Sequence, residues 1–310
     1  MLLSDDAVPL YRLLAPRFWG IWLALGLLRL AVLLPYRVQA RIGRGVGRVA
    51  MTFARRRRQI AARNIELCFP EWDDRQRQRL LHQHFESLGM TLIEMGLCWW
   101  ASDARLKPLF EIEGLEHLQA ALQHGKGVIM LTGHFTTLDL GGRFLTMQAP
   151  VTAMYRPNEN PLFNEIMRRG RERSAQRAIP KQDIRGMVRA LRENHAIWYA
   201  PDQSHRRGHS ALVPFFAVPA PSNTATSALA RMSGARVVPF LSLRLPNDQG
   251  YRFIIEPALT GFPGDDPEAD TLRINQWLER RIRLAPEQYL WIHRRFKPWD
   301  PGAPDPYAGI

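Results

Sequence analysis

Short strand-like runs alternate with helix-like runs over residues 128–284, and this alternation restricts the fold of the chain more than any other feature. Strands that alternate with helices predict an α/β domain, in which a mostly parallel central sheet is flanked by helices. The predicted strands are Val128–Leu131, Val151–Tyr155, Ile197–Ala200, Val237–Leu245 and Tyr251–Ile255. The predicted helices are Asp74–Trp100, Leu138–Met147, Pro161–Arg173, Ile184–Glu193, Asn223–Ser233 and Glu268–Leu284.

An almost entirely apolar segment, Phe18–Pro35, lies near the N-terminus. Its length is near the lower limit for a membrane-spanning helix, which needs about 17–25 residues. No small-residue cleavage site follows it, so we expect an uncleaved membrane helix within residues 1–40. Residues 41–310 then form one domain that ends in a proline-rich tail. Because Arg29 is costly at the bilayer centre, a helix lying in the interface is the alternative.

The chain is strongly basic, with a formal net charge of +13, so its partners are expected to be polyanions. Arginines are frequent directly after the apolar segment, and the run Arg55–Arg58 is the densest. By the positive-inside rule this side of the membrane is cytoplasmic, and such a segment also attracts anionic lipids. The run is single and lacks a recognition motif, so we expect no nucleic-acid partner.

Neither metal nor nucleotide chemistry is indicated. Cys68 and Cys98 have no metal-like spacing, and no cluster of metal-ligating residues is visible. Gly43, Gly45 and Gly47 lie in an arginine-rich, helix-like segment and do not follow a strand, so they fail the context test for a dinucleotide-binding loop. We therefore expect no metal site.

His134 and Asp139 stand five residues apart, just after the first predicted strand. On one continuous helix such residues lie about 140° apart, so the side chains can meet only across a strand-to-helix turn. Thr136 or Thr137 could cap the following helix, leaving His134 in the turn and Asp139 in the first helical turn. A carboxylate beside an imidazole fixes its tautomer and stabilises the imidazolium, as a general base requires. On spacing alone, a surface histidine beside an unrelated aspartate is the alternative.

Two further polar residues, Arg156 and Asp202, each follow another predicted strand. Functional residues in such folds gather at the carboxyl ends of strands, so we expect both to lie near His134.

The histidine–acid element and five further blocks resemble, in their order along the chain, the late acyltransferases of lipid A biosynthesis. These lauroyl and myristoyl transferases belong to the glycerolipid and lysophospholipid acyltransferase superfamily. The subfamily often has glutamate where this chain has Asp139, which shortens the reach by one methylene. The likeness covers almost the entire chain and rests on the blocks Arg63–Pro70, Tyr155–Asn158, Ala200–Gln203, Val213–Phe216 and Ala285–Phe296.

The resemblance implies an inner-membrane enzyme that faces the cytoplasm. It would transfer an acyl chain, laurate as the first expectation, from acyl carrier protein to a hydroxyl of a phosphorylated glycolipid, a Kdo-bearing or tetraacyl lipid A precursor. His134 would be the base and Asp139 would orient it. No cofactor is implied beyond the carrier's own phosphopantetheine thioester. No Gly-x-Ser-x-Gly elbow occurs, so we expect direct transfer without an acyl-serine intermediate.

The resemblance also implies substrate-binding residues. Arg156 matches the arginine that binds the acceptor phosphate or the oxyanion, and Asn158 belongs to the same block. Asp202 and Gln203 match a block that shapes the acceptor site.

Arg171, with Arg168, Arg169 and Arg173, could form a groove for the carrier or the phosphorylated sugar, or an ordinary basic face. His205, His209 and His293 lack a partnered carboxylate at suggestive spacing, so structural or surface roles are expected for them.

Two other functions are compatible with these residues. One is an acyltransferase of the same superfamily that acts on a lysophospholipid, an ornithine lipid or another glycolipid. The other is a non-catalytic lipid-binding protein of the membrane surface. The sequence sets no oligomeric state.

Overall fold

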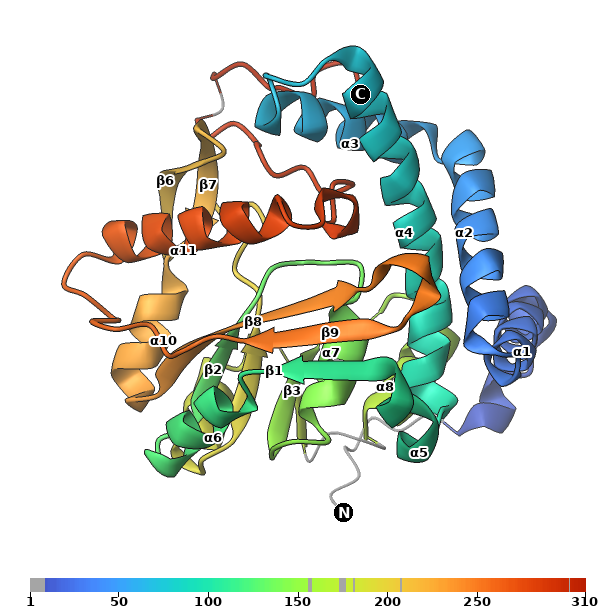
Figure 1. Cartoon of the computed structure of the whole chain (residues 1–310), viewed down its shortest axis with the longest axis horizontal. Coiled ribbons are helices and arrows are strands. Elements are labelled where there is room, and N and C mark those ends of the chain that lie inside the picture. Colours follow the sequence, from blue (N-terminus) through green and yellow to red (C-terminus); the bar gives the residue numbers. More distant parts are fainter. Residues whose placement is uncertain (1–8, 156–157, 173–176, 181, 207, 301) are drawn as a thin grey trace.

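A seven-stranded sheet forms the centre of the computed structural model, which describes residues 9–155, 158–172, 177–180, 182–206, 208–300 and 302–310 (Figure 1). The strand order is β1-β9-β8-β2-β5-β3-β4, and among the described residues of this sheet only β8 and β9 pair antiparallel. The predicted mostly parallel sheet flanked by helices is therefore confirmed. The strands are β1 (Phe110–Glu113), β2 (Val128–Leu131), β3 (Val151–Tyr155), β4 (Arg177–Pro180), β5 (Ala196–Tyr199), β8 (Arg236–Arg244) and β9 (Tyr251–Ile255).

Helices cover both faces of this sheet because its central strands are apolar on both sides. Ile129 and Leu131 of β2 pack into one hydrophobic cluster, and Val128 and Met130 pack into another. The first cluster includes residues of α9 (Ile184–Arg192), α10 (Ala225–Ser233) and α11 (Pro267–Ile282). The second includes residues of α6 (Leu115–Gln123) and α7 (Leu138–Leu145). The sheet is thus buried on both faces, as parallel sheets are.

The N-terminal half adds a layer of helices beside the sheet. Helices α1 (Trp19–Leu33) and α2 (Tyr36–Phe53) pack against the long helix α4 (Asp74–Trp100), on the right of Figure 1. A capping box fixes the start of α4, because the Asp73 side chain accepts from Gln76 N and the Gln76 side chain accepts from Asp73 N. The other elements are α3 (Arg55–Cys68), α5 (Asp103–Leu106), α8 (Pro161–Glu172), the hairpin β6 (Ser210–Phe215) and β7 (Val218–Asn223), and five short 3₁₀ helices, Leu10–Leu13, Pro16–Phe18, Lys107–Leu109, Pro246–Asp248 and Pro286–Gln288.

Three glycines let α2 and α4 approach until their backbones touch. Gly43 and Gly47 lie one turn apart on α2 and face Gly89 of α4. A Cβ atom added to Gly89 would lie 2.0 Å from the carbonyl oxygen of Gly43. No other residue type fits there without moving one of the helices.

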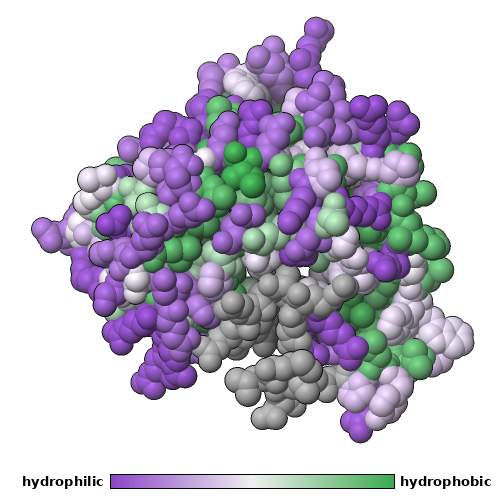
Figure 2. Space-filling view, turned by 60° about the horizontal axis from the view of Figure 1, so that its bottom comes forward, coloured by the Kyte–Doolittle hydropathy of each residue, from purple (hydrophilic) through white to green (hydrophobic). Residues whose placement is uncertain are grey.

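Helix α1 exposes most of its apolar surface. By length and composition, Pro16–Leu33 is the one segment of the described chain that could cross a membrane. Trp19, Leu23, Leu27 and Leu30 are exposed, whereas Leu25 and Val32 are buried against the protein. In Figure 2 hydrophobic residues gather at the right-hand edge, the side on which Figure 1 places α1 and α2. This surface is suited to lipid rather than to water.

We expect Gly89→Ala to lower the free energy of unfolding by about 1–3 kcal/mol, because the added methyl group overpacks the contact between α2 and α4. Gly45→Ala is the matched control, since a Cβ at this helical position meets nothing within 4 Å. Alanine favours helix by about 1 kcal/mol over glycine, so the control should be neutral or stabilising. Urea unfolding in detergent, followed by circular dichroism, compares the two variants. Equal effects would refute the close helix contact.

Candidate active site

His134 lies in the turn that joins β2 to α7. The strand ends at Leu131, and α7 begins at Leu138 with Thr137 in the N-cap position. The side chain of Thr137 donates to the carbonyl oxygen of Ser242 in β8, at 2.7 Å. As predicted, the turn holds His134 and the first turn of α7 holds Asp139.

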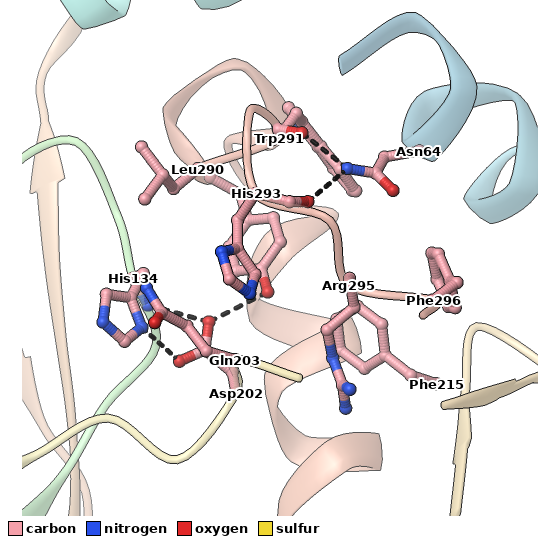
Figure 3. Close-up of a pocket in the computed structure, with 11 residues that line it drawn as sticks. Asn64, His134, Asp202, Gln203, Phe215, Leu290, Trp291, His293, Arg295 and Phe296 are labelled. Atoms are coloured by element: carbon pink, nitrogen blue, oxygen red, sulfur yellow. Dashed lines mark hydrogen bonds and ion pairs between the residues drawn. The ribbon is translucent and has the colours of Figure 1, made fainter. Parts of the chain in front are cut away.

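The carboxylate of Asp202 holds the imidazole of His134 from below (Figure 3). Its Oδ1 lies 2.6 Å from His134 Nδ1, and its Oδ2 accepts from the backbone N–H of His134 at 3.0 Å. The hydroxyl of Tyr289 donates to the same Oδ2 at 2.9 Å. A hydrogen bond to a carboxylate assigns the proton to Nδ1, so Nε2 is the ring nitrogen able to accept a proton.

Asp202 is ionised even though it is almost completely buried. Burial alone would raise its pKa, but the charge of His134 and the hydrogen bonds from His134 and Tyr289 outweigh burial and hold the pKa of Asp202 well below its ordinary value. The site therefore carries a fixed negative charge next to the imidazole. Such a charge stabilises an imidazolium formed when Nε2 takes up a proton.

The structure changes the role predicted for Asp202. We expected it to shape the acceptor site, but its carboxylate is 3% exposed and bonds His134. Asp202 orients the imidazole, which is the task the sequence analysis gave to Asp139. Sequence spacing did not indicate the contact between His134 and Asp202, because the two residues are 68 positions apart and meet at neighbouring strand ends. Asp139 lines the same cavity as His134, and its catalytic role stays a prediction.

The segment after α11 holds the His134 turn from the other side. His134 O accepts from the backbone N–H of Leu290 at 2.9 Å, and Thr136 N donates to Gln288 O at 2.7 Å. This segment also supplies Tyr289. It belongs to the block Ala285–Phe296 noted in the sequence, but that block carried no signal that Tyr289 would reach Asp202.

A hydrogen bond connects the same turn to α4, next to a buried ion pair between α4 and β8. Arg244 Nε donates to Glu94 Oε1 at 2.8 Å, and Arg244 Nη1 donates to Ser87 Oγ at 2.9 Å. Ser87 Oγ in turn lies 2.7 Å from Thr136 Oγ1, two residues after His134. Because Glu94 and Arg244 are taken out of water together, breaking the pair would leave an uncompensated buried charge.

A very small cavity of about 10 Å³ lies behind Asp202 (Figure 3). His293 and Arg295 line it, and Arg295 donates to Pro221 O and Ser222 Oγ at 2.6 and 2.7 Å. Burial lowers the pKa of His293 to about 4, so its ring is neutral at physiological pH. The structural role expected for His293 suits this place, which is buried and close to Asp202.

A much larger cavity of about 660 Å³ opens on the other side of His134. This volume is within the range of small-molecule sites, about 300–1,000 Å³. Along α7 the lining extends from Leu138 to Thr146, a rise of about 12 Å. The cavity therefore extends alongside α7, and His134 lines it at the carboxyl edge of the sheet. Asp139, Arg143 and Thr146 are the polar side chains that α7 contributes. The apolar lining includes residues of α4, β3, β5 and α9, namely Cys98, Trp99, Val151, Ala153, Met154, Ile184, Met187 and Trp198.

Polar side chains of the loop after β5 line the same cavity. Among them are Gln203, predicted as a substrate residue, and His205 and His209, for which structural or surface roles were expected. Substrate binding by Gln203 stays a prediction.

Three other predicted site residues are Arg156, Arg171 and Asn158. Arg156 lies outside the described residues, and Arg171 is in α8 but its side chain is not described. Asn158 is exposed, and its Oδ1 accepts from Asn160 N in the turn before α8. Their substrate contacts stay predictions. Over the described ranges, no three histidine, cysteine or carboxylate side chains are grouped so that they could hold a metal ion.

Comparisons with a family model and with known proteins point to the same family. The family model described as bacterial lipid A biosynthesis acyltransferase matches residues 10–298. The lipid A biosynthesis lauroyltransferase of Escherichia coli K12 is 43% identical over 95% of this chain and 97% of its own length. The palmitoleoyltransferase of that strain is 42% identical over 92% and 93%, and its myristoyltransferase is 27% identical over 94% and 91%.

We expect Asp202→Asn to lower the free energy of unfolding by about 2–3 kcal/mol at pH 7. The folded-state pKa of Asp202 lies below the unfolded value of about 3.9, so its contribution is present above about pH 4 and is lost as the pH falls further. The difference in the free energy of unfolding between wild type and variant should therefore become smaller in acid. Urea unfolding at several pH values measures it, with the exposed Asp300→Asn as control. A gap that does not change with pH would contradict this assignment.

Proposed function

The chain belongs to the bacterial lipid A biosynthesis acyltransferase family, and from this premise we propose that it transfers an acyl chain from acyl carrier protein to a hydroxyl of a phosphorylated lipid A precursor. The observation that carries the proposal is the hydrogen bond between His134 Nδ1 and Asp202 beside a large, mostly apolar cavity that His134 lines. This hydrogen bond orients a general base next to a cavity that can hold an acyl chain.

The base acts through Nε2 of His134. An alcohol is a weak nucleophile, so its proton passes to Nε2 as its oxygen attacks the thioester carbonyl. The negative charge of Asp202 stabilises the imidazolium that results. When the intermediate collapses, the C–S bond breaks and the new C–O bond remains. The imidazolium returns its proton to the leaving thiolate, and the enzyme regains its starting state.

The acyl chain occupies the cavity along α7. Most of its lining is apolar, although α7 contributes the polar side chains of Asp139, Arg143 and Thr146, and the loop after β5 contributes Gln203, His205 and His209. Burial of each methylene contributes roughly 0.8 kcal/mol, which favours a long chain in this space. Two relatives of nearly equal identity are named for different chains, lauroyl and palmitoleoyl. Laurate is our proposal for this protein.

The protein works at the cytoplasmic face of the bacterial inner membrane. The exposed apolar surface of α1 and the arginines that follow it support this placement. The donor brings its own phosphopantetheine thioester, so the proposed reaction needs no resident cofactor. A Kdo-bearing or tetraacyl precursor is the proposed acceptor.

We expect His134→Ala to abolish acyl transfer while membrane association is retained. The assay incubates purified protein with lauroyl, myristoyl and palmitoleoyl carrier protein and a tetraacyl lipid A precursor, and mass spectrometry detects the added chain. In cells that lack the gene, lipid A should lose the mass of one secondary acyl chain. Unaltered lipid A in those cells, or full activity of the variant, would overturn the proposal.

We expect Asp202→Asn to reduce kcat/KM by about three orders of magnitude or more, because the wrong imidazole tautomer is favoured. The residual activity should persist to lower pH than in wild type, since the imidazolium has lost its counter-charge. The pH profile of Asp139→Asn is the comparison. If Asp139→Asn shifted the acidic limb of the profile of activity against pH and Asp202→Asn did not, Asp139 and not Asp202 would be the orienting carboxylate.

Direct transfer is tested with a radiolabelled donor in the absence of acceptor. No label should remain on the protein after denaturation, because the acyl group passes straight from sulfur to the acceptor hydroxyl. A labelled band that survives denaturation would show a covalent acyl-enzyme and would refute direct transfer.

A further inference from the structure

The outer face of α9 carries a stripe of three exposed arginines. Arg185, Arg189 and Arg192 follow one another at spacings of four and three residues, so they lie on one face of the helix. A groove beside them is lined by the apolar side chains of Ile184, Val188 and Met232. Ile184 is 46% exposed and Met232 is 48% exposed. Positive charge and open apolar surface therefore occur together.

Within the part of the chain that the structure describes, these arginines are not used in ion pairs. Over the described residues, none of the three has a carboxylate at ion-pair distance, and Arg192 donates only to the backbone carbonyl of Met232. One carboxylate, Glu193, lies at the end of the groove. The stripe keeps a net positive charge, which is available to an acidic partner.

The arginines of α8 differ in this respect. Arg168 and Arg169 both donate to Glu165, at 2.7 and 2.6 Å, and the carboxylate of Glu165 is 2% exposed. Much of their charge is compensated inside the protein. The sequence analysis considered this helix for the carrier groove, but the charges of α9 are more accessible.

The stripe begins at the rim of the large cavity. Ile184 lines both the surface groove and the cavity, and Met187, less than one turn further along α9, lines the cavity from within. A partner seated on α9 would therefore be next to the space in which the acyl chain is proposed to lie. A flexible arm could pass from such a partner over Ile184 toward His134.

We propose that the outer face of α9, defined by Arg185, Arg189, Arg192 and the groove between Ile184 and Met232, is the docking surface for the acidic carrier protein that delivers the acyl thioester. This inference rests on the proposed function. Carboxylates on a helix of the carrier pair with the arginines, and its apolar side chains enter the groove. Electrostatic pairing of this kind mainly sets the rate of association and the orientation of the partner, and it adds little buried area.

The test compares two double variants in steady-state kinetics. In Arg185→Glu/Arg189→Glu the stripe is reversed, whereas Arg75→Glu/Arg79→Glu reverses an equally spaced, exposed pair on α4. The control pair begins about 36 Å along α4 from Trp99 of the cavity. Both proteins are assayed with lauroyl carrier protein and the tetraacyl precursor, at low and at physiological ionic strength.

For the α9 variant we expect the KM for the carrier donor to rise about ten-fold, with kcat and the KM for the acceptor little changed. The salt dependence of the donor KM should also weaken, because exposed charge pairs are screened. The control variant should behave as wild type. A wild-type donor KM in the α9 variant, or the same rise in both variants, would overturn the docking surface and leave the proposed reaction intact.

A membrane role for the stripe gives a different result. If Arg185→Glu/Arg189→Glu weakened binding to phosphatidylglycerol vesicles and left the donor KM unchanged, the arginines would face lipid and the docking proposal would be wrong. If wild-type protein transferred nothing from the carrier donor, the proposed function itself would fail. The two failures are thus distinguishable.

Discussion

The active site depends on one buried carboxylate. Asp202 holds His134 at both its ring nitrogen and its backbone nitrogen, so it sets the position of the turn and the tautomer of the base together. Removing this carboxylate from water is costly, and the hydroxyl of Tyr289 contributes to the compensation. The block that supplies Tyr289 also pairs with the His134 turn along its backbone. Residues of the block Ala285–Phe296 are therefore a part of the site.

Much of the fold could be predicted from the sequence because its central strands are short, apolar and separated by helical periodicity. β2, β3 and β9 begin and end where the pattern placed them, as does α4. The pattern missed β1 and β4, which lie at the two edges of the sheet, and the β6–β7 hairpin. Edge strands and an isolated hairpin are buried incompletely, so their sequences carry weaker apolar signals.

The site was predictable as a location but not as a set of contacts. The strand-to-helix turn identified His134, and strand-end placement brought Asp202 near it. Sequence spacing could not show that the orienting carboxylate comes from the neighbouring strand, nor that Tyr289 approaches from beyond α11. Such partners meet through the order of strands in the sheet, which one sequence does not reveal. The arginines are a different case, because Arg168 and Arg169 pair with Glu165 three and four residues earlier on the same helix, a contact that sequence spacing allows.

The glycine contact between α2 and α4 has a consequence for how the enzyme meets its lipid. Helix α4 touches α2 through Gly89, and two residues before this glycine Ser87 bonds Thr136, two residues after His134. Helix α2 and the His134 turn are thus attached to the same short stretch of α4. In the proposed membrane placement, the distance of His134 from the bilayer would be a fixed dimension of the fold. An acceptor would then have to present its hydroxyl at that distance, so the depth of its headgroup in the membrane would be a criterion of selection in its own right.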